Sequence, residues 1–429
     1  MIFVIYNFII IILYSIIRMI SFFPGPIRRE FLKREKSLNT VLQTKINPNK
    51  EVIWLHSASV GELDQAKAIA TVLKKKNPNI FILQSVFSSS VKENHLNDPV
   101  LDLSFFLPFD LPFVYDSIFF NLRPKKLIIL AWDTWPNLLR SANKWHTPSY
   151  LVCASLNKNS TRNKGFAALL TKKSFSYLAG IYPSHSVLEK EFLPFLSKQT
   201  DFAVLGDSRF DSVTLKLETK EPPKSFTDFI NKQFESIRKN PPVIFGSTYP
   251  VCESYLLEYL TNHPTNDFFW IFPHKWDEDR IRPVMEKISE FGTVSKFSLL
   301  KDKDTLEVLP KFLFFDEIGI LAFAYRYGKI AYVGGGFHNR IHNTIEPAAL
   351  GLPILTGPKI SNAPEAIVMN ELGGIFINKT KNDFVNNLDI LLKNENTKKK
   401  MGEINRNFVV ENKGASEKIY LRVFLNDSH

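Results

Sequence analysis

Residues 330–358 read IAYVGGGFHNRIHNTIEPAALGLPILTGP, and this stretch decides the fold class. It opens with four strand-forming residues, 330–333, which run into three consecutive glycines. A polar loop follows, and then a helical segment around Glu346 that ends at Gly351 before another apolar strand begins. Strand, loop, helix and strand in this order are typical of a nucleotide-binding α/β unit.

The three glycines, Gly334, Gly335 and Gly336, predict an anion site. Glycines after a strand let backbone N–H groups approach a phosphate closely, and the N-terminus of the following helix adds its positive dipole end. A carboxylate in the first helical turn, here Glu346, could accept hydrogen bonds from both hydroxyls of a ribose. The structural alternative is a tight turn at a helix entry that binds no ligand.

Outward from this stretch, short apolar runs alternate with helical segments along most of the chain. The clearest helix is predicted over 62–76, where four apolar residues at spacings of three and four share one face. Such alternation predicts an α/β fold with parallel sheets covered on both sides. The predicted strands are 52–55, 80–83, 127–130, 150–152, 181–182, 202–205, 243–245, 268–272, 313–315, 330–333 and 375–377.

The length and composition predict two domains. The chain has 429 residues, of which 45% are hydrophobic, and this suffices for two cores of roughly 150 to 200 residues each. Charge and paired prolines replace the apolar pattern in ETKEPPK, residues 218–224, and Asn240-Pro241-Pro242 marks the next start. We therefore predict an N-terminal domain over 24–217, a linker over 218–241 and a C-terminal domain over 242–429.

Cysteine usage and net charge restrict the compartment and the partners. Cys153 and Cys252 fit no metal or redox spacing, which favours a reducing compartment and excludes a disulfide scaffold. The formal net charge of +11 predicts an acidic partner such as nucleic acid, anionic lipid or a phosphorylated substrate. Basic and aromatic residues do not interleave in one stripe, so nucleic acid is the least favoured of the three.

The first residues predict a membrane anchor over 1–23. Only Arg18 interrupts their apolar run, whose length is close to the about 20 residues that a spanning helix needs. A signal peptide is the alternative, but its positive n-region and small-residue cleavage site are missing. The basic segment that follows keeps this side cytoplasmic and attracts anionic head groups, unless it is only a solvated linker. Its basic residues are Arg28, Arg29, Lys33, Arg34 and Lys36.

The loop HSASVGE, residues 56–62, is the first candidate for chemistry. It lies between a predicted strand and an amphipathic helix, so a serine could cap the helix and Glu62 falls in its first turn. The helix dipole favours the carboxylate form of Glu62, which suits it to take a proton from an attacking hydroxyl. The structural alternative is a glutamate that only stabilises its own helix.

Three further loops follow predicted strands. Asp133 stands between two tryptophans before the helix that Pro136 begins, where it could bind sugar hydroxyls or only cap that helix. Ser247 and Thr248 could donate hydrogen bonds to a phosphate, or cap a helix. His274-Lys275 could supply positive charge, or form an exposed basic turn. Because parallel strands place their carboxyl ends at one edge, these loops are expected to line a ligand site.

Metal sites are not favoured by the sequence. The acidic groups at 277–279 and 302–304 could hold a divalent ion, but both belong to strongly charged segments that solvent is expected to cover. His338 and His342 are four residues apart, yet they lie in a glycine-led loop without an obvious carboxylate helper. We therefore predict no metal and no cofactor.

Five ordered motifs together resemble the 3-deoxy-D-manno-octulosonic acid (Kdo) transferases of lipopolysaccharide assembly. They are IWLHSASVGE at 53–62, WPNLL at 135–139, LGDSRFD at 205–211, GST at 246–248 and HNTIEPAALGLPILTGP at 342–358. The resemblance covers nearly the whole chain. It implies a glycosyltransferase-B fold, in which two Rossmann-like domains face each other across a cleft, together with a membrane anchor, CMP-Kdo as donor and a lipid A precursor as acceptor.

The resemblance also assigns roles to residues. It makes Glu62 the general base, and it places Asp133 where the family has the second of two glutamates, with Ala131 in place of the first. The loop residues His56, Ser59 and Gly61 are expected to bind the acceptor. The residues expected on the CMP-Kdo side are Ser247, Thr248, His274, Lys275, Gly319, Gly334, Gly335, Gly336, Asn343 and Glu346.

Two positions on the donor side depart from the family pattern. Ile320 stands where an acidic residue is common, and Pro273-His274-Lys275 replaces the order proline, arginine, histidine. Lys275 retains a positive charge, but a lysine lacks the bidentate fork of arginine, so the contact with the phosphate is expected to differ.

The implied reaction is a single inverting displacement without a metal at the cytoplasmic face of the bacterial inner membrane. Glu62 deprotonates the acceptor hydroxyl while CMP departs from the opposite face of the sugar. Inverting glycosidases likewise attack one face of the sugar while the leaving group departs from the other. One alternative is a related glycosyltransferase that uses a UDP-sugar. The other is a membrane-anchored nucleotide-binding protein without catalysis, which would not need Glu62.

Overall fold

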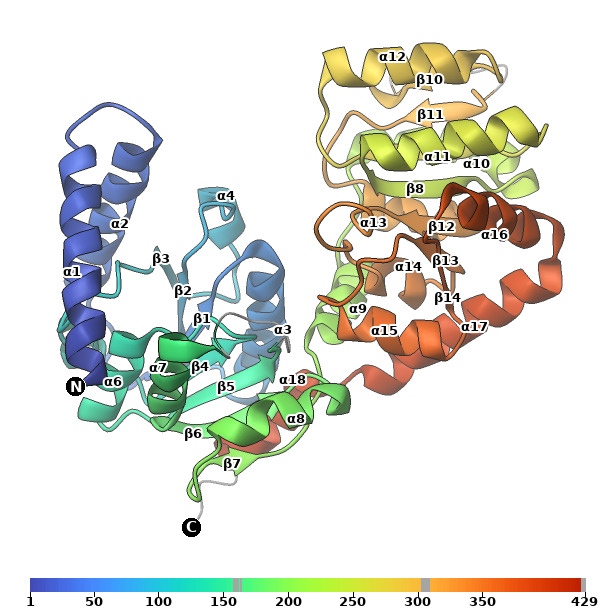
Figure 1. Cartoon of the computed structure of the whole chain (residues 1–429). Helices are drawn as coiled ribbons and strands as arrows, with labels where there is room; N and C mark the ends of the chain where they lie inside the picture. The colour runs from blue at the N-terminus through green and yellow to red at the C-terminus, as the bar shows by residue number, and fades with distance from the viewer. Residues whose placement is uncertain (157–161, 163, 302–308, 426–429) are drawn as a thin grey trace. The chain divides into compact units, whose positions relative to one another are not determined.

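The chain folds into two compact α/β units (Figure 1). The computed structural model describes residues 1–156, 162, 164–301 and 309–425. Unit 1 comprises Met1–Ser212 together with Lys413–His429, and unit 2 comprises Val213–Asn412. The last residues of the chain therefore belong to the same unit as the first.

Unit 1 contains a seven-stranded sheet in the order β3-β2-β1-β4-β5-β6-β7, in which all strand pairs are parallel. The central strands are buried along nearly their whole length, as expected for a sheet covered on both faces. The strands are β1 (Glu51–Ser57), β2 (Ile80–Val86), β3 (Leu103–Phe106), β4 (Lys126–Leu130), β5 (Ser149–Ala154), β6 (Leu178–Pro183) and β7 (Asp201–Phe202).

Helices cover both faces of this sheet. One hydrophobic core joins Trp54 and Ile129 of the sheet to Val41, Phe119 and Leu139 of the helices on one face. A second core lies on the other face, beneath α3 and α18. The helices of unit 1 are α1 (Ile2–Ile20), α2 (Pro26–Gln43), α3 (Val60–Lys76), α4 (Glu93–Leu96), α5 (Asp116–Leu122), α6 (Pro136–Lys144), α7 (Gly165–Phe175), α8 (Glu189–Phe192), α9 (Arg209–Thr219), which continues into unit 2, and α18 (Ala415–Tyr420).

Unit 2 repeats this plan with the order β10-β11-β9-β8-β12-β13-β14, again in parallel pairs. Its strands are β8 (Val243–Thr248), β9 (Phe269–Pro273), β10 (Val294–Lys296), β11 (Phe312–Phe314), β12 (Ile330–Val333), β13 (Ile354–Thr356) and β14 (Ile375–Ile377). Its helices include α10 (Lys224–Lys239), α11 (Pro250–Asn262), α12 (Glu278–Ser289), α13 (Leu321–Ala324), α14 (Ile345–Ala349), α15 (Pro364–Glu371), α16 (Lys381–Lys393) and α17 (Glu395–Asn412).

The predicted α/β fold with parallel sheets is confirmed. The strand predicted over 202–205 is shorter, since β7 ends at Phe202, and the sequence analysis did not predict β3 and β10. Both of these missed strands are short, and each lies toward one edge of its sheet.

The predicted linker over 218–241 differs from the structure. Residues 224–239 form α10, whose Phe226, Phe229 and Ile230 are buried in unit 2. Pro223 is the residue just before this helix, a place where proline is compatible with helix formation. The predicted C-terminal domain, 242–429, is also too long, because α18 packs into unit 1 through Ile419 and Val423.

Among the described residues, α1 alone is a helix long and apolar enough to cross a membrane. A signal sequence has the same length and composition.

Candidate active site

The predicted site residues lie at the switch points of the two sheets. In unit 1 the strand order reverses between β1 and β4, and the loops after these strands carry Glu62 and Asp133. In unit 2 it reverses between β8 and β12; Ser247 lies at the carboxyl end of β8, and Gly334–Gly336 follow β12. Ligands of open parallel sheets bind outside the carboxyl ends of the strands at such points.

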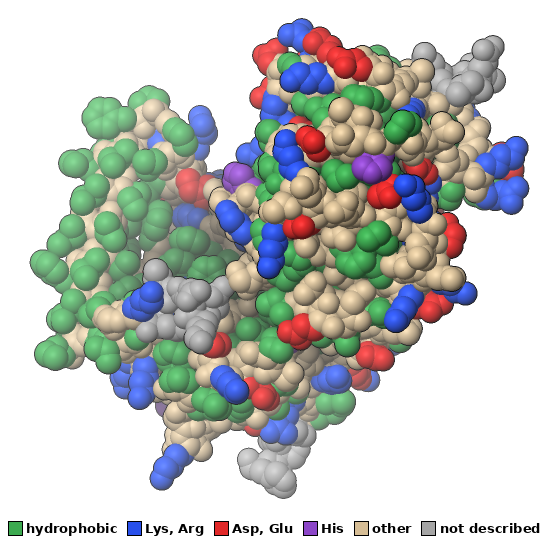
Figure 2. Space-filling view, turned by 45° about the vertical axis from the view of Figure 1, so that its right-hand side comes forward, with side chains coloured by type: hydrophobic (Ala, Val, Ile, Leu, Met, Phe, Trp, Pro, Cys, Tyr) green, Lys and Arg blue, Asp and Glu red, His purple; other side chains and the backbone are tan. Residues whose placement is uncertain are grey.

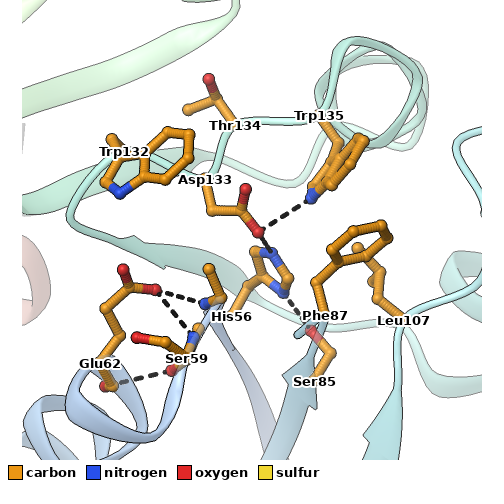
Figure 3. A network of polar contacts seen from close by, with 12 residues as sticks. His56, Ser59, Glu62, Ser85, Phe87, Leu107, Trp132, Asp133, Thr134 and Trp135 are labelled. Carbon is orange, nitrogen blue, oxygen red and sulfur yellow. Dashed lines mark hydrogen bonds and ion pairs between the residues drawn. The ribbon is translucent and has the colours of Figure 1, made fainter. Parts of the chain in front are cut away.

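Glu62 occupies the third position of α3 and interacts with the start of its own helix. Ser59 is the N-cap residue, and its backbone N–H donates to Oε2 of Glu62 at 3.2 Å. The backbone N–H of Ala58 donates to the same oxygen. Figure 3 shows the carboxylate turned toward these donors. The helix N-terminus favours the carboxylate form, so Glu62 both caps α3 and presents a proton acceptor at the switch point.

A buried chain of hydrogen bonds connects the carboxyl ends of β1 and β2 to the loop after β4 (Figure 3). Nδ1 of His56 lies 2.8 Å from Oγ of Ser85, and its Nε2 lies 3.0 Å from Oδ2 of Asp133. Trp54 Nε1 donates to the same serine at 2.8 Å, and Trp135 Nε1 donates to the same aspartate oxygen at 3.1 Å. Because a carboxylate only accepts, Nε2 of His56 donates the hydrogen bond to Asp133.

The environment of Asp133 favours its ionised form. Burial acts to raise the pKa of Asp133, but the hydrogen bonds from His56 and Trp135 and the positive charge of Arg162 hold this pKa below its ordinary value. Arg162 donates to the Trp132 carbonyl at 2.9 Å and to Thr134 Oγ1 at 3.1 Å, and its guanidinium lies 4.6 Å from the centre of the Trp132 ring. Arg162 therefore fixes the loop that carries Asp133.

The three residues expected to bind the acceptor have different environments. His56 is fully buried, which contradicts a direct contact with the acceptor in this conformation and makes it a partner of Asp133 instead. Ser59 is half-buried at the start of α3. Gly61 is exposed, and a Cβ atom added to it would meet no other atom within 4 Å. Ser59 and Gly61 thus remain accessible at the switch point of unit 1.

The three glycines after β12 pack against neighbouring backbone. A Cβ atom on Gly334 would lie 2.0 Å from the Ser247 carbonyl oxygen, and one on Gly336 would lie 2.7 Å from that of Gly357. Gly335 has a φ of 90°, which L-residues rarely adopt. The glycines therefore bring the loops after β8, β12 and β13 into close contact, and their fit to a phosphate stays a prediction.

In the GST motif at the end of β8, Ser247 and Thr248 have different environments. Ser247 has a φ of 54°, an uncommon backbone conformation for a serine that occurs at functional and tightly packed sites. Thr248 is buried, and its hydroxyl donates to Glu253 at 2.9 Å, while Arg280 donates to the other oxygen of Glu253 at 2.7 Å. The side chain of Thr248 is thus occupied within unit 2, which leaves Ser247 as the more accessible of the two.

Three imidazoles stack around Tyr249 at the carboxyl ends of β8, β9 and β12. The ring centres of His274, His338 and His342 lie 4.9, 4.8 and 5.8 Å from that of Tyr249. The Tyr249 hydroxyl lies 3.2 Å from Nε2 of His342. We call His274, His338, His342 and Tyr249 the imidazole cluster. Lys275 follows His274, and Arg340 lies two residues after His338; both side chains are exposed. They add positive charge beside the cluster, which itself becomes positively charged when an imidazole gains a proton.

Two histidines of the imidazole cluster, His274 and His342, favour the neutral form. Burial, and then the positive charges of His274 and Arg340, lower the pKa of His342 to about 4. Burial and the charges of Lys275, His338 and Arg340 lower the pKa of His274. A bound anion would reverse this effect, because an opposite charge favours the imidazolium. The spacing of His338 and His342 suggests only a pair of metal ligands, and no local signal in the sequence predicts the roles of Tyr249 and Arg340.

The remaining donor-side residues lie around α13 and α14. Oδ1 of Asn343 accepts from the Ile345 N–H at 2.9 Å and so caps α14. Glu346 forms an ion pair of 2.8 Å with Lys216 of α9, which no local signal in the sequence predicts. Gly319 has a φ of 94° in an open loop before α13. Ile320 is fully buried, which explains why this chain has no acidic residue there.

The LGDSRFD motif has a structural role in unit 1. Asp207 is buried, and it accepts hydrogen bonds from Gln65 of α3 at 2.7 Å and from Arg209 at 2.8 Å. Asp211 accepts from the backbone N–H groups of Gly414 and Ser416 at 2.6 and 2.7 Å. The motif therefore holds both α3, which carries Glu62, and the start of α18.

The acidic residues at 277–279 have structural partners. Asp277 caps α12 by accepting from Arg280 N, and Glu278 pairs with Lys296 at 2.5 Å. The described residues contain no group of three side chains suited to hold a metal ion, and residues 302–304 lie outside the part that is described.

Solved structures with the same fold include two-domain sugar-nucleotide enzymes. A UDP-GlcNAc 2-epimerase from Neisseria meningitidis covers 88% of this chain and 100% of its own, with a TM-score of 0.63 and 14% identity. A glycosyltransferase from Rickettsia africae covers 88% and 98%, with a TM-score of 0.55 and 13% identity. Two parallel α/β units with polar loops at their switch points thus define a glycosyltransferase-B fold, as predicted.

Sequence comparison then gives the family. Residues 30–212 match the family model described as 3-Deoxy-D-manno-octulosonic-acid transferase (kdotransferase). The 3-deoxy-D-manno-octulosonic acid transferase of Rickettsia bellii is 26% identical over 404 residues, which cover 92% of this chain and 91% of that protein. The enzyme of the same name from Haemophilus influenzae is 23% identical over 383 residues, covering 87% and 86%. These matches, which together span most of the chain, support a Kdo transferase, which is a glycosyltransferase.

Proposed function

We propose that this protein transfers Kdo from CMP-Kdo to a hydroxyl of a lipid A precursor, with inversion and without a metal. The observation that carries the proposal is the Glu62 carboxylate, held by backbone N–H groups at the switch point of unit 1 in a Kdo transferase. The similarity to Kdo transferases supports the sugar, because the sequence relatives are named 3-deoxy-D-manno-octulosonic acid transferases.

In the proposed reaction Glu62 is the general base. It takes the proton of the acceptor hydroxyl as that oxygen forms a bond to the anomeric carbon of Kdo. The bond between this carbon and the phosphate oxygen breaks at the same time, and CMP leaves with the electron pair. Asp133, held ionised by His56, Trp135 and Arg162, is proposed to bind a polar group of the acceptor or sugar near Glu62.

The proposed donor site is the loop region of unit 2. The imidazole cluster, Lys275 and Arg340 offer positive charge to the phosphate of CMP and to the sugar carboxylate. Ser247, the backbone after β12, Gly319, Asn343 and Glu346 complete the site. Glu346 is proposed to exchange its ion pair with Lys216 for the ribose hydroxyls when the nucleotide binds.

The proposed location is the cytoplasmic face of the bacterial inner membrane. The apolar helix α1 and the basic residues that follow it support contact with an anionic leaflet, which would also hold the lipid acceptor. The net charge of +11 has the sign that such a leaflet and a phosphorylated acceptor require.

The test is incubation of the purified protein with CMP-Kdo and a tetraacylated lipid A precursor, followed by mass analysis of the product. We expect the mass of the acceptor to rise by one or more Kdo residues. A panel of UDP-sugars serves as the comparison. Transfer from a UDP-sugar but not from CMP-Kdo would contradict the proposed donor.

A further inference from the structure

Helix α1 presents two different faces. One face packs on unit 1: Phe3 stacks near Tyr177 at 6.0 Å, and Tyr14 lies 5.7 Å from Phe31 and 5.9 Å from Phe109. The opposite face is apolar and exposed along the whole helix. Its exposed apolar residues are Val4, Ile5, Phe8, Ile9, Ile11, Ile12, Leu13, Ile16, Met19 and Ile20.

Polar contacts hold the N-terminal end of α1 against unit 1. The Tyr6 hydroxyl donates to Asp110 Oδ2 at 2.8 Å, and Asn137 Nδ2 donates to Asn7 Oδ1 at 2.9 Å. Asp110 is itself buried, and it accepts from the backbone N–H groups of Asn137 and Leu138 at 3.0 and 3.2 Å. These groups start α6, so the contact is part of the folded unit.

The C-terminal end of α1 is held as well. Arg18 forms an ion pair with Glu35 of α2 at 3.3 Å, and its guanidinium lies 5.6 Å from the centre of the Phe31 ring. A helix of 19 residues is about 28 Å long at about 1.5 Å per residue. Because both ends contact unit 1, the helix axis runs along the surface of that unit. A spanning helix would have to break one set of contacts or draw the sheet into the bilayer.

We infer that α1 does not cross the membrane but lies in its surface, with the exposed face in the acyl region of an anionic phospholipid leaflet and both ends on the cytoplasmic side. Amphipathic helices that bind in this way bury one apolar face and keep polar contacts on the other. The inference differs from the expectation of a spanning anchor. It rests on the membrane contact in the proposed function, but not on the transfer of Kdo.

Neighbouring elements extend the same surface. The turn after α1 exposes Phe22 and Phe23, and α7, which packs beside α1, exposes Phe166 and Leu169. Figure 2 shows apolar side chains gathered over the α1 and α2 hairpin. This area is too apolar and too continuous for the surface of a helix that water surrounds.

Positively charged residues at the edge of this surface favour an anionic bilayer, rather than a protein, as its partner. Arg28 and Arg29 of α2 are exposed next to the turn, and Lys172 and Lys173 are exposed at the end of α7. The nearby acids Glu30 and Glu35 are engaged by Arg34, Lys33 and Arg18. Basic residues beside an apolar face are attracted to an anionic leaflet.

The decisive test compares the two sides of the membrane. A short hydrophilic tag with one cysteine is fused ahead of Met1 of the full chain, and Asp279→Cys provides a second label in unit 2, where Asp279 is exposed. The native Cys153 and Cys252 are buried. Membrane-impermeant maleimide is added to spheroplasts before and after lysis. We expect both labels to react only after lysis, and reaction of tag and body from opposite sides would overturn the inference.

A second measurement reports the contact itself. Asn7→Cys and Asn137→Cys are combined in native membranes and treated with a short bis-maleimide, and the linked peptides are identified by mass. We expect cross-linking in the pair and none in either single variant. Its absence in membranes, with cross-linking only in detergent, would show that α1 leaves unit 1 in the bilayer and would overturn the inference.

Vesicle flotation tests the lipid partner. The full chain should float with phosphatidylglycerol vesicles, and Phe8→Glu with Ile12→Glu should reduce the bound fraction at least tenfold. Val410→Glu, an exposed apolar position in unit 2, is the matched control. Equal binding to phosphatidylcholine would contradict the anionic partner. If the protein transferred no Kdo but both cysteine labels reacted from the cytoplasmic side, the proposed function would be contradicted. The inferred position of α1 in the membrane surface would still hold.

Discussion

At the residue scale, Glu62 combines a structural and a chemical role. A glutamine keeps the side-chain contact that caps α3 but cannot accept a proton at neutral pH. We therefore predict that Glu62→Gln folds normally, binds CMP as the parent does, and loses about 10² to 10⁴ in single-turnover rate. Rapid-quench transfer assays and calorimetric CMP binding check this. An unchanged rate would remove Glu62 from catalysis.

The half-buried His342 predicts how the stability of unit 2 depends on pH. Its pKa falls from an ordinary 6.5 to about 4 in the folded protein because of burial and nearby positive charge. The unfolded chain therefore binds more protons between these values, and the stability that His342 contributes is present above pH 6.5 and lost as the pH falls toward 4.

We expect the melting temperature of the protein to fall between pH 7 and pH 5, and less steeply in His342→Gln. Saturating CMP should reduce the slope of the parent, because a bound phosphate favours the imidazolium. Thermal unfolding followed by tryptophan fluorescence across this pH range gives the slopes. Equal slopes in the parent and the variant would show that His342 does not control this dependence.

At the element scale, the glycine loop after β12 is set by backbone packing. A methyl group on Gly334 would lie 2.0 Å from the Ser247 carbonyl oxygen, and the loops after β8 and β12 would have to separate. We predict that Gly334→Ala costs about 1 to 3 kcal/mol of stability and weakens CMP binding. Calorimetry measures both quantities.

Gly61→Ala is the matched control for this prediction. Nothing lies within 4 Å of its added methyl group, and alanine favours the first turn of α3 more than glycine does. This variant should keep or raise the melting temperature and keep CMP binding. A reduced rate of transfer to the lipid acceptor alone would support an acceptor contact at Gly61.

Several elements followed directly from the sequence. The sequence predicts α3 and its cap because apolar residues at helical spacing follow a serine, and no proline or later glycine interrupts them. The strand β12 and its glycines were predicted by a continuous apolar run before a turn signal. In contrast, the proline pair before α10 has the composition of a linker, and only packing shows that Pro223 precedes a helix.

The candidate site was only partly predictable for a physical reason. Glu62 and Asp133 each follow a strand and have local signals, whereas Ser85 and Arg162 act through contacts with distant parts of the chain. The imidazole cluster joins residues from three loops, so no spacing in one loop reveals it. Local sequence patterns predict the helices and strands, whereas the sheet topology determines which of the loops at their ends lie together.

At the scale of the whole molecule, the C-terminal segment completes unit 1. Ile419 and Val423 are fully buried in the core beneath α3, and Lys126 donates to the Val423 carbonyl at 2.8 Å. We predict that Ile419→Ala lowers the unfolding free energy of unit 1 by about 2 to 5 kcal/mol. Leu421→Ala, at an exposed position of the same segment, should change it by less than about 0.5 kcal/mol.

Denaturant unfolding with separate probes for the two units measures this effect. CMP binding, which is proposed to occur in unit 2, should survive in Ile419→Ala under native conditions. If both variants unfolded like the parent, the contact of α18 with unit 1 would not contribute to stability.

Because the chain returns to unit 1 at its C-terminus, unit 1 is the last to be completed during translation. Unit 2 is continuous, from Val213 to Asn412, whereas unit 1 lacks its last helix until the final residues emerge. At about 5 to 20 residues per second, the growing chain carries an incomplete unit 1 for tens of seconds after Ser212 has been made. During this interval the apolar N-terminal helix has already left the exit tunnel, so a nascent protein of this kind can reach lipid before the unit that carries Glu62 is complete.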